Sequence, residues 1–264
     1  MDVLLERRGR VAVLTVSDPA RRNALSRELS DLLAQAVAEC DGDESVHAVV
    51  ITGAPPAFCA GADLGVLTAA AESGSAADLR HIYSGFLAVA NAALPTIAAV
   101  GGPAVGAGLN LALACDLRLV GPGASFDARF LRLGIHPGGG MTWLAQRAAG
   151  AQTAAAMTLF GEPLDAREAV RTGLAHRLIE VAGEAHSPAA HEALVAAAVD
   201  FARRAAAAPR DLVLATKAAL RATAVLTEHA DAVAYETAPQ LASLRSEAFT
   251  RLITSARSKR PAGW

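Results

Sequence analysis

The sequence is poor in aromatic residues and in cysteine. Aromatic side chains make up 4% of the 264 residues, whereas hydrophobic residues make up 53%. The core is therefore expected to be aliphatic, and the length fits one compact domain with at most a small appended element. Cys40, Cys59 and Cys115 form no CxxC pair and no even set, which argues against a secreted disulfide scaffold and favours a reduced, cytoplasmic protein.

An excess of charge and a long apolar run are also missing. The formal net charge is −2, and no run of five or six like charges occurs. Such a sequence offers no electrostatic surface for nucleic acid and little attraction to an anionic membrane. Charges interrupt residues 1–16 (MDVLLERRGRVAVLTV) too early for a signal-peptide core, and no later apolar run is long enough to span a bilayer. We expect a cytoplasmic protein with no nucleic-acid or membrane partner.

Short valine-rich segments alternate with segments of helical periodicity in the first half of the chain. Residues 11–16 and 47–52 have the length and branching of buried strands. Residues 26–40, between them, place leucine and valine at helical spacing after a capping serine. Further helices are expected at residues 81–93 and 107–115, and further strands at residues 96–100 and 117–120. This alternation predicts an α/β fold with a mainly parallel sheet covered on both faces.

Helical patterns dominate the second half of the chain. Helices are expected at residues 141–149, 151–159 and 165–172, with a last strand at residues 176–181. From Pro188 onward the chain is almost wholly helix-prone, and Pro209 separates two alanine-rich helices at residues 189–208 and 211–227. We therefore predict a core at residues 1–187 and a C-terminal helical region at residues 188–264, which packs on itself or on a neighbouring subunit.

Two loops dense in small residues each follow an expected strand. They read AFCAGADL at residues 57–64 and GPAVGAGLN at residues 102–110. Small residues let a ligand approach the backbone, and N–H groups at the start of a helix have no partner within it. Two such amides can form an oxyanion hole for a thioester carbonyl. Tight structural turns are the alternative, whereas a dinucleotide site is disfavoured because Leu111 takes the third position of GxGxxG.

Taken in order, these motifs resemble the crotonase superfamily, also called the enoyl-CoA hydratase/isomerase family. The resemblance rests on AFCAGADL, PTIAAVGGPAVGAGLNLALACDLRLV, SDPARRNALS at residues 17–26 and the C-terminal SKRPAGW. It implies the ClpP/crotonase fold, a spiral core of repeated strand, strand and helix units with a C-terminal helical region that forms a trimer or a dimer of trimers. It also implies an acyl-CoA substrate or ligand, a role in fatty acid metabolism, and no cofactor other than the coenzyme A of the substrate.

The resemblance also implies which residues form the site. Family members hold the thioester oxygen with two backbone amides, which by motif match fall on Ala62 and Ala107. The matching coenzyme A contact positions are Arg22, Ala24, Ala60, Asp63 and Leu64. Arg22 is expected either to meet a phosphate of coenzyme A or to be a solvated surface residue. Asp63 is expected to stabilise a turn rather than to act as a catalyst.

Two positions depart from the family's pattern. Hydratases of the family use two glutamates to hold and activate water, and these positions fall on Asn110 and, through the frame of SFDARFLRLGIHP, on Phe130. An amide accepts no proton at neutral pH, and a phenyl ring supplies neither an acid nor a base. Phe130 instead adds an apolar lining that suits an alkyl chain. We therefore expect hydratase activity to be weak or absent, and the standard isomerase mechanism is in doubt as well.

Asp127 and His136 are the remaining candidates for acid–base chemistry. Asp127 lies three positions before Phe130 and is interpreted mainly as a cap or as an ion-pair partner of Arg129 or Arg132. His136, in GIHPGGG, is the better candidate because an imidazole titrates near neutral pH, although a structural hydrogen bond is the alternative. The other histidines show no metal-ligand spacing and no GxSxG occurs, so neither a metal nor a serine nucleophile is expected.

Three functions stay open on the sequence. The first is an acyl-CoA enzyme, by family a hydratase or isomerase, with unconventional acid–base groups. The second is a non-catalytic fatty acyl-CoA binding, carrier or regulatory protein. The third is enolate chemistry in which His136 removes a proton alpha to the thioester. Acyl length is not specified, since pocket depth depends on residues 66–77, whose Gly, Ser and Ala content predicts a mobile loop.

Overall fold

A computed structural model describes residues 1–181 and 183–258 of the chain, and side chains as far as residue 255. Apart from Ser258, the C-terminal SKRPAGW motif lies outside the described residues. The chain divides into two compact units, Met1–Ala206 and Ala207–Trp264. The division falls later than the boundary predicted after residue 187, because helix α7 (Pro188–Ala206) packs on the sheet of the first unit.

A six-stranded sheet in the order β1-β2-β3-β4-β6-β9 forms the centre of the first unit. Its strands are β1 (Asp2–Arg8), β2 (Val11–Ser17), β3 (Ala48–Gly53), β4 (Thr96–Val100), β6 (Leu117–Val120) and β9 (Arg177–Leu178). The β1–β2 pair is antiparallel, and β2, β3, β4, β6 and β9 pair in parallel. The predicted mainly parallel sheet is confirmed, with an added edge strand whose charged side chains hid it from the sequence pattern.

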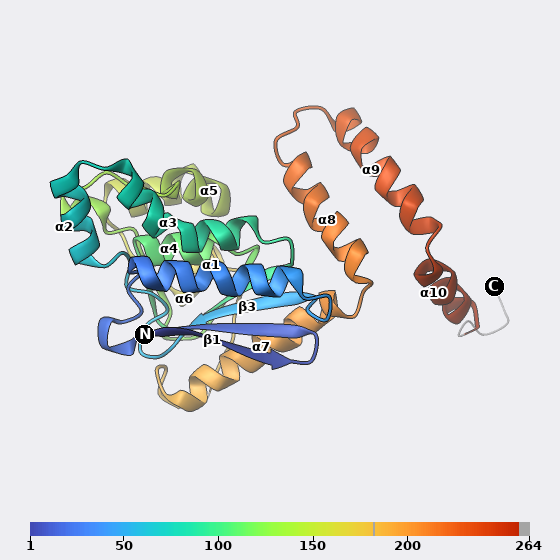
Figure 1. Ribbon diagram of the computed structural model, residues 1–264, viewed down its shortest axis with the longest axis horizontal. Helices are drawn as coiled ribbons and strands as arrows, with labels where there is room; N and C mark the ends of the chain where they lie inside the picture. Colours follow the sequence, from blue (N-terminus) through green and yellow to red (C-terminus); the bar gives the residue numbers. More distant parts are fainter. Residues whose placement is uncertain (182, 259–264) are drawn as a thin grey trace. The chain divides into compact units, whose positions relative to one another are not determined.

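Helices bury both faces of this sheet, as the alternation predicted. Leu194, Val195 and Val199 of α7 pack against Val11 and Val50 on one face. Helix α1 (Arg27–Gly42) lies across the opposite face, with α3 (Ala76–Asn91) packed beside it (Figure 1). The predicted serine cap of α1 is present, since the hydroxyl of the residue before it accepts a hydrogen bond from the helix backbone.

A small second sheet leads the chain into the loops that matter for function. Its order is β5-β7-β8, with strands β5 (Pro103–Val105), β7 (Ser125–Asp127) and β8 (Leu164–Asp165). Strands β5 and β7 are parallel, with Val105 opposite Asp127. The segments that follow these two strands therefore leave the sheet side by side, one into helix α4 (Ala107–Ala114) and the other into the short helix η2 (Phe130–Leu133).

Residues 66–77, predicted to be a mobile loop, are mostly helix α2 (Leu64–Ser73). Asp63 caps this helix by accepting hydrogen bonds from the backbone of Gly65 at 2.9 Å and Val66 at 3.4 Å. Gly74 ends it in the left-handed conformation, with φ 61°. The prediction was wrong because alanine has the highest helix propensity, and here it outweighs the flexible residues beside it.

The remaining elements are helices, of which η1 was not predicted and the last two were expected only as a general helical tendency. They are η1 (Pro19–Arg21), α5 (Met141–Leu159), α6 (Ala166–Arg171) and, in the second unit, α8 (Arg210–Thr223), α9 (His229–Leu244) and α10 (Glu247–Ser258). The two helices predicted on either side of residue 150 are confirmed, since the backbone of Gly150, with φ 79° and ψ 167°, is not helical and divides α5. The last strand is shorter than predicted. Within the described parts of the chain, no helix combines the length and apolar character needed to cross a bilayer.

Candidate functional site

A cavity of about 750 Å³ opens in the first unit beside the two loops of small residues. The residues predicted for the site, with the exception of Arg22, line it: Ala24, Ala60, Ala62, Asp63, Leu64, Ala107, Asn110, Phe130 and His136. Most of the other lining side chains are apolar and come from α2, α3 and the η2 region. The fold thus gathers segments that are far apart in the sequence around one apolar space.

Backbone hydrogen bonds hold the two loops together. Cys59 N donates to Pro103 O at 3.1 Å, and Val105 N donates to Cys59 O at 2.9 Å. Gly108 lies so close to this junction that a Cβ atom there would overlap the Cys59 carbonyl oxygen. Gly61, with φ 110°, makes a similar approach to Val105 O, which would lie 2.9 Å from an added Cβ. Glycine is therefore required on each side of the junction.

Ala62 and Ala107, the residues expected to supply two backbone N–H groups, both line the cavity. Ala107 is the first residue of α4, so its N–H has no acceptor within the helix. In the neighbouring loop, Gly61 O accepts from Leu25 N at 2.7 Å, which anchors the chain just before Ala62. Within the described residues, neither amide donates a hydrogen bond to the protein. Two free donors at one wall suit an oxygen that gains negative charge.

Asn110 is buried one turn into α4, with 1% of its surface exposed. Its Nδ2 donates to Gly138 O at 2.9 Å. Because a carbonyl oxygen only accepts, this bond sets the amide orientation and leaves Oδ1 as the group available to a ligand. Oδ1 has no hydrogen-bond partner among the residues described. A buried acceptor without a partner is unfavourable unless a water or a ligand donates to it.

Asp127 is an ion-pair partner rather than a wall of the cavity. Its buried carboxylate lies 2.8 Å from the guanidinium of Arg129 and 3.5 Å from that of Arg132. Arg129 lines the cavity, whereas Asp127 does not. This geometry agrees with the ion-pair interpretation. A carboxylate that pairs with two arginines and does not line the cavity is not placed to exchange a proton with a ligand there.

His136 and Phe130 contribute to the same wall from the segment after β7. His136 is exposed, and its Nδ1 lies 2.7 Å from Pro137 O. Because a carbonyl oxygen only accepts hydrogen bonds, Nδ1 must carry the proton in this contact. Nε2 is then the acceptor nitrogen of the neutral imidazole. Phe130 is half-buried at the start of η2 and adds its ring to the apolar lining.

Arg22 was expected to contact coenzyme A, but it is not among the residues that line the cavity. Its neighbour Arg21 lines the cavity instead. Arg21 pairs with Asp18 at 2.8 Å and with Asp63 at 3.4 Å. Arg22 is exposed with φ 51°, and its carbonyl accepts from Ala60 N at 3.0 Å. The phosphate contact implied for Arg22 stays a prediction. The role of Asp63 as a turn-stabilising carboxylate agrees with its capping of α2.

Tyr83 is a lining residue that reasoning from the sequence missed. It lies on α3, where its ring centroid is 5.4 Å from that of Phe86. Its hydroxyl oxygen lies 2.5 Å from the position that a Cβ on Gly138 would take. The only local signal was its rarity, since the chain has two tyrosines. Periodicity alone does not distinguish a tyrosine in a ligand cavity from one in an apolar helix face.

The cysteines supply no reactive group to this site. Cys40, Cys59 and Cys115 are buried and form no disulfide. Burial raises the pKa of Cys59 to about 12 and that of Cys40 to about 11. These two thiols are therefore neutral near pH 7, and a neutral thiol is a weak nucleophile.

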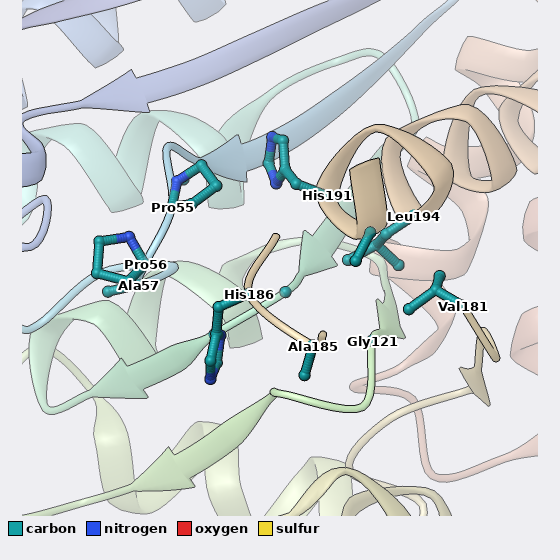
Figure 2. A pocket seen from close by; sticks show the side chains of 13 residues that line it. Pro55, Pro56, Ala57, Gly121, Val181, Ala185, His186, His191 and Leu194 are labelled. Atoms are coloured by element: carbon teal, nitrogen blue, oxygen red, sulfur yellow. The ribbon is translucent and has the colours of Figure 1, made fainter. Parts of the chain in front are cut away.

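A second recess lies near His186 and His191, between α7 and the loop of Pro55 and Pro56 (Figure 2). Its volume is about 10 Å³, enough for one water molecule and far too small for a thioester. Burial lowers the pKa of His191 and so favours its neutral form. Among the described side chains, no three of His, Cys, Asp or Glu meet as a metal site would require.

Comparison with known proteins agrees with the motifs and the geometry. The chain matches the enoyl-CoA hydratase/isomerase family over residues 6–259. A protein named as a probable enoyl-CoA hydratase from Mycobacterium tuberculosis is 49% identical over 262 residues, which span 97% of this chain and 98% of that protein.

Solved structures agree. One of a probable enoyl-CoA hydratase/isomerase from Mycobacterium abscessus shares 30% identity with a TM-score of 0.84, covering 100% of this chain and 98% of that one. The fold is also that of an enoyl-CoA hydratase from Bacillus anthracis, at 24% identity and a TM-score of 0.88, covering 98% of this chain and 97% of that one. The chain therefore belongs to the enoyl-CoA hydratase/isomerase family, the crotonase superfamily, and has the crotonase fold.

Proposed function

We propose that the protein binds acyl-CoA thioesters with the carbonyl oxygen against Ala62 N and Ala107 N and the acyl chain in the apolar cavity. The observation that carries this proposal is the pair of amides without protein partners at the wall of a cavity of about 750 Å³. Backbone donors of this kind recognise an oxygen that carries or gains negative charge. Membership of the family supports a coenzyme A ester as the source of that oxygen.

We also propose that the protein is a poor hydratase. Among the described residues that line the cavity there is no glutamate, and the carboxylate present, Asp63, caps α2 and pairs with Arg21. At the two positions matched to the family's glutamates, the amide of Asn110 and the ring of Phe130 take no proton at neutral pH. A positioned acid or base contributes a factor of about 10² to 10⁴ to the rate, so the loss of both has a large effect.

Hydration of crotonyl-CoA tests this proposal. We expect turnover to be about 10⁴-fold or more below that of a family member with both glutamates, assayed in parallel with crotonyl-CoA and longer enoyl-CoAs. Calorimetry is expected to detect binding of acyl-CoAs by the same preparation. Ordinary turnover would contradict the loss of hydratase activity. Failure to bind any acyl-CoA, from short to long, would contradict the function itself.

Two uses of the bound thioester are compatible with this site. The apolar lining around Phe130 favours a binding, carrier or regulatory protein for fatty acyl-CoA. The free acceptor Nε2 of His136 favours instead an enzyme that removes a proton alpha to the thioester while the two amides hold the enolate. A screen of acyl-CoA substrates with the native protein and His136→Ala separates them, since only the enzyme would lose a turnover that the native protein has.

We further propose a homotrimer or homohexamer of the cytoplasm that acts in fatty acid metabolism. Large apolar side chains are exposed on the helices of the second unit, among them Leu220 at 69% and Leu252 at 57%, and such surfaces suit contacts between subunits. The free cysteines suit a reducing compartment. We expect light scattering of the purified protein to give three or six times the chain mass, whereas the mass of one chain would contradict the assembly.

A further inference from the structure

Most polar side chains of the cavity are already bound to other parts of the protein. Arg21 and Asp63 pair with each other, and Arg129 pairs with Asp127. Two buried or half-buried groups differ from these. Asn110 Oδ1 is buried without a partner among the described residues, and the half-buried Tyr83 lines the same cavity.

These two groups meet at one short segment of backbone. The carbonyl of Gly138 accepts from Asn110 Nδ2 at 2.9 Å, and the Tyr83 hydroxyl lies 2.5 Å from where a Cβ of Gly138 would be. Gly139 has φ 65°, and a Cβ atom added to it would lie 2.6 Å from Asn110 Nδ2. Because these two glycines have no side chain, their loop can pack tightly against helices α3 and α4. This packing places the tyrosine and the asparagine at the same end of the cavity.

The pair also lies close to the proposed oxyanion hole. Asn110 is three residues after Ala107 on α4, and side chains at this spacing share a face of the helix about 5–6 Å apart. A thioester carbonyl at Ala107 N would thus bring the first carbons of the acyl chain next to the Asn110 amide. The polar pair would face the acyl part of the ligand, and the coenzyme A part would lie elsewhere.

The chemistry of the two groups indicates what they would bind. Asn110 Oδ1 can only accept a hydrogen bond, whereas a tyrosine hydroxyl can both donate and accept one. An alcohol on the acyl chain satisfies both groups, because its hydrogen goes to Oδ1 and its oxygen receives the hydrogen of Tyr83. A saturated or enoyl chain offers neither a donor nor an acceptor here and leaves Oδ1 unpaired.

We propose that Tyr83 is a specificity-determining residue that, together with Asn110, recognises a hydroxyl group on the acyl chain of the thioester. The preferred ligand of this protein is then a hydroxyacyl-CoA rather than its saturated counterpart. This inference rests on the proposed function, since the carbonyl must be held at Ala107 for the hydroxyl to reach the pair. It assigns a ligand contact to a residue outside the two loops.

Calorimetry with three thioesters of equal chain length tests the proposal: butyryl-CoA, 3-hydroxybutyryl-CoA and 4-hydroxybutyryl-CoA. We expect the native protein to bind at least one hydroxylated ester about 10-fold or more tightly than butyryl-CoA, because sites built for a hydroxyl discriminate strongly against its absence. Tyr83→Phe keeps the ring but removes the hydroxyl, so it is expected to bring this ratio close to one. Tyr235→Phe, an exposed tyrosine of the second unit, is the matched control and should keep the native ratio.

The outcomes separate this inference from the function on which it rests. Equal binding of all three esters by the native protein would overturn the role of Tyr83 and leave acyl-CoA binding intact. A preference for the hydroxyl that survives in both Tyr83→Phe and Asn110→Leu would also overturn it. If neither these esters nor longer acyl-CoAs bind, the proposed function and the inference fail together.

Discussion

Replacing Gly108 by alanine is expected to lower the free energy of unfolding by about 3 kcal/mol or more and to abolish acyl-CoA binding. The added Cβ would overlap the carbonyl oxygen of Cys59, and backbone cannot move aside as the end of a flexible side chain can. Cys59 and Val105 pair the two loops at this point. A shift that relieves the overlap must therefore separate Ala62 N from Ala107 N, and the oxyanion hole depends on their geometry.

Gly42→Ala is the matched control for this prediction. Gly42 also lies in a helix, at the end of α1, and a Cβ there would meet nothing within 4 Å. Since alanine is the better helix former, this variant should be as stable as the native protein or slightly more so. Urea unfolding followed by circular dichroism gives both free energies, and calorimetry gives the binding. A Gly108→Ala protein with native stability and native affinity would show that the loops are not locked at this contact.

Replacing Ala107 by proline is expected to remove one donor of the oxyanion hole while the fold is kept. Proline has no N–H, and it is well tolerated at the first position of a helix, where Ala107 lies. Loss of one such donor lowers turnover by about 10² to 10³ in enzymes that use it. For binding of a ground-state thioester, the expected loss is about 0.5–1.5 kcal/mol, or roughly 2- to 13-fold in affinity.

A ligand without the carbonyl oxygen makes this prediction specific. The native protein should bind butyryl-CoA more tightly than the corresponding thioether, whereas Ala107→Pro should bind the two with similar affinity. Ala166→Pro is the control, because Ala166 is the first residue of α6 and does not line the cavity. It should keep the native preference for the thioester. If Ala107→Pro also keeps that preference while folded, the amide of residue 107 does not bind the carbonyl.

The regular elements of the first unit were predictable because their signals are local. The strand expected at residues 96–100 is β4 (Thr96–Val100), and the serine expected to cap the first helix does so. Branched apolar runs and caps act over a few residues, so the sequence carries them without reference to the rest of the fold. The helix at residues 64–73 was not predicted, because small residues were taken as a sign of mobility although alanine among them favours a helix.

The family and the two loops could also be identified from the sequence, since their motifs are contiguous. The match over residues 6–259 agrees with the resemblance that those motifs carried. Contiguous motifs indicate which residues of the two loops supply the amides. They do not indicate how the two loops pack together, because the close contact of Gly108 with Cys59 joins residues that are far apart in the chain.

The tertiary structure decided which polar side chains surround the ligand. Arg22, whose backbone is left-handed, is not among the lining residues, whereas its neighbour Arg21 is. Packing of α7 on the sheet moved the division between units beyond residue 187. The sequence by itself determined the family, the small-residue loops and the presence of Asn110 where an acid was expected. Only the fold brought Tyr83 and Gly138 to that asparagine, because contacts between separate elements depend on packing and leave no local pattern in the chain.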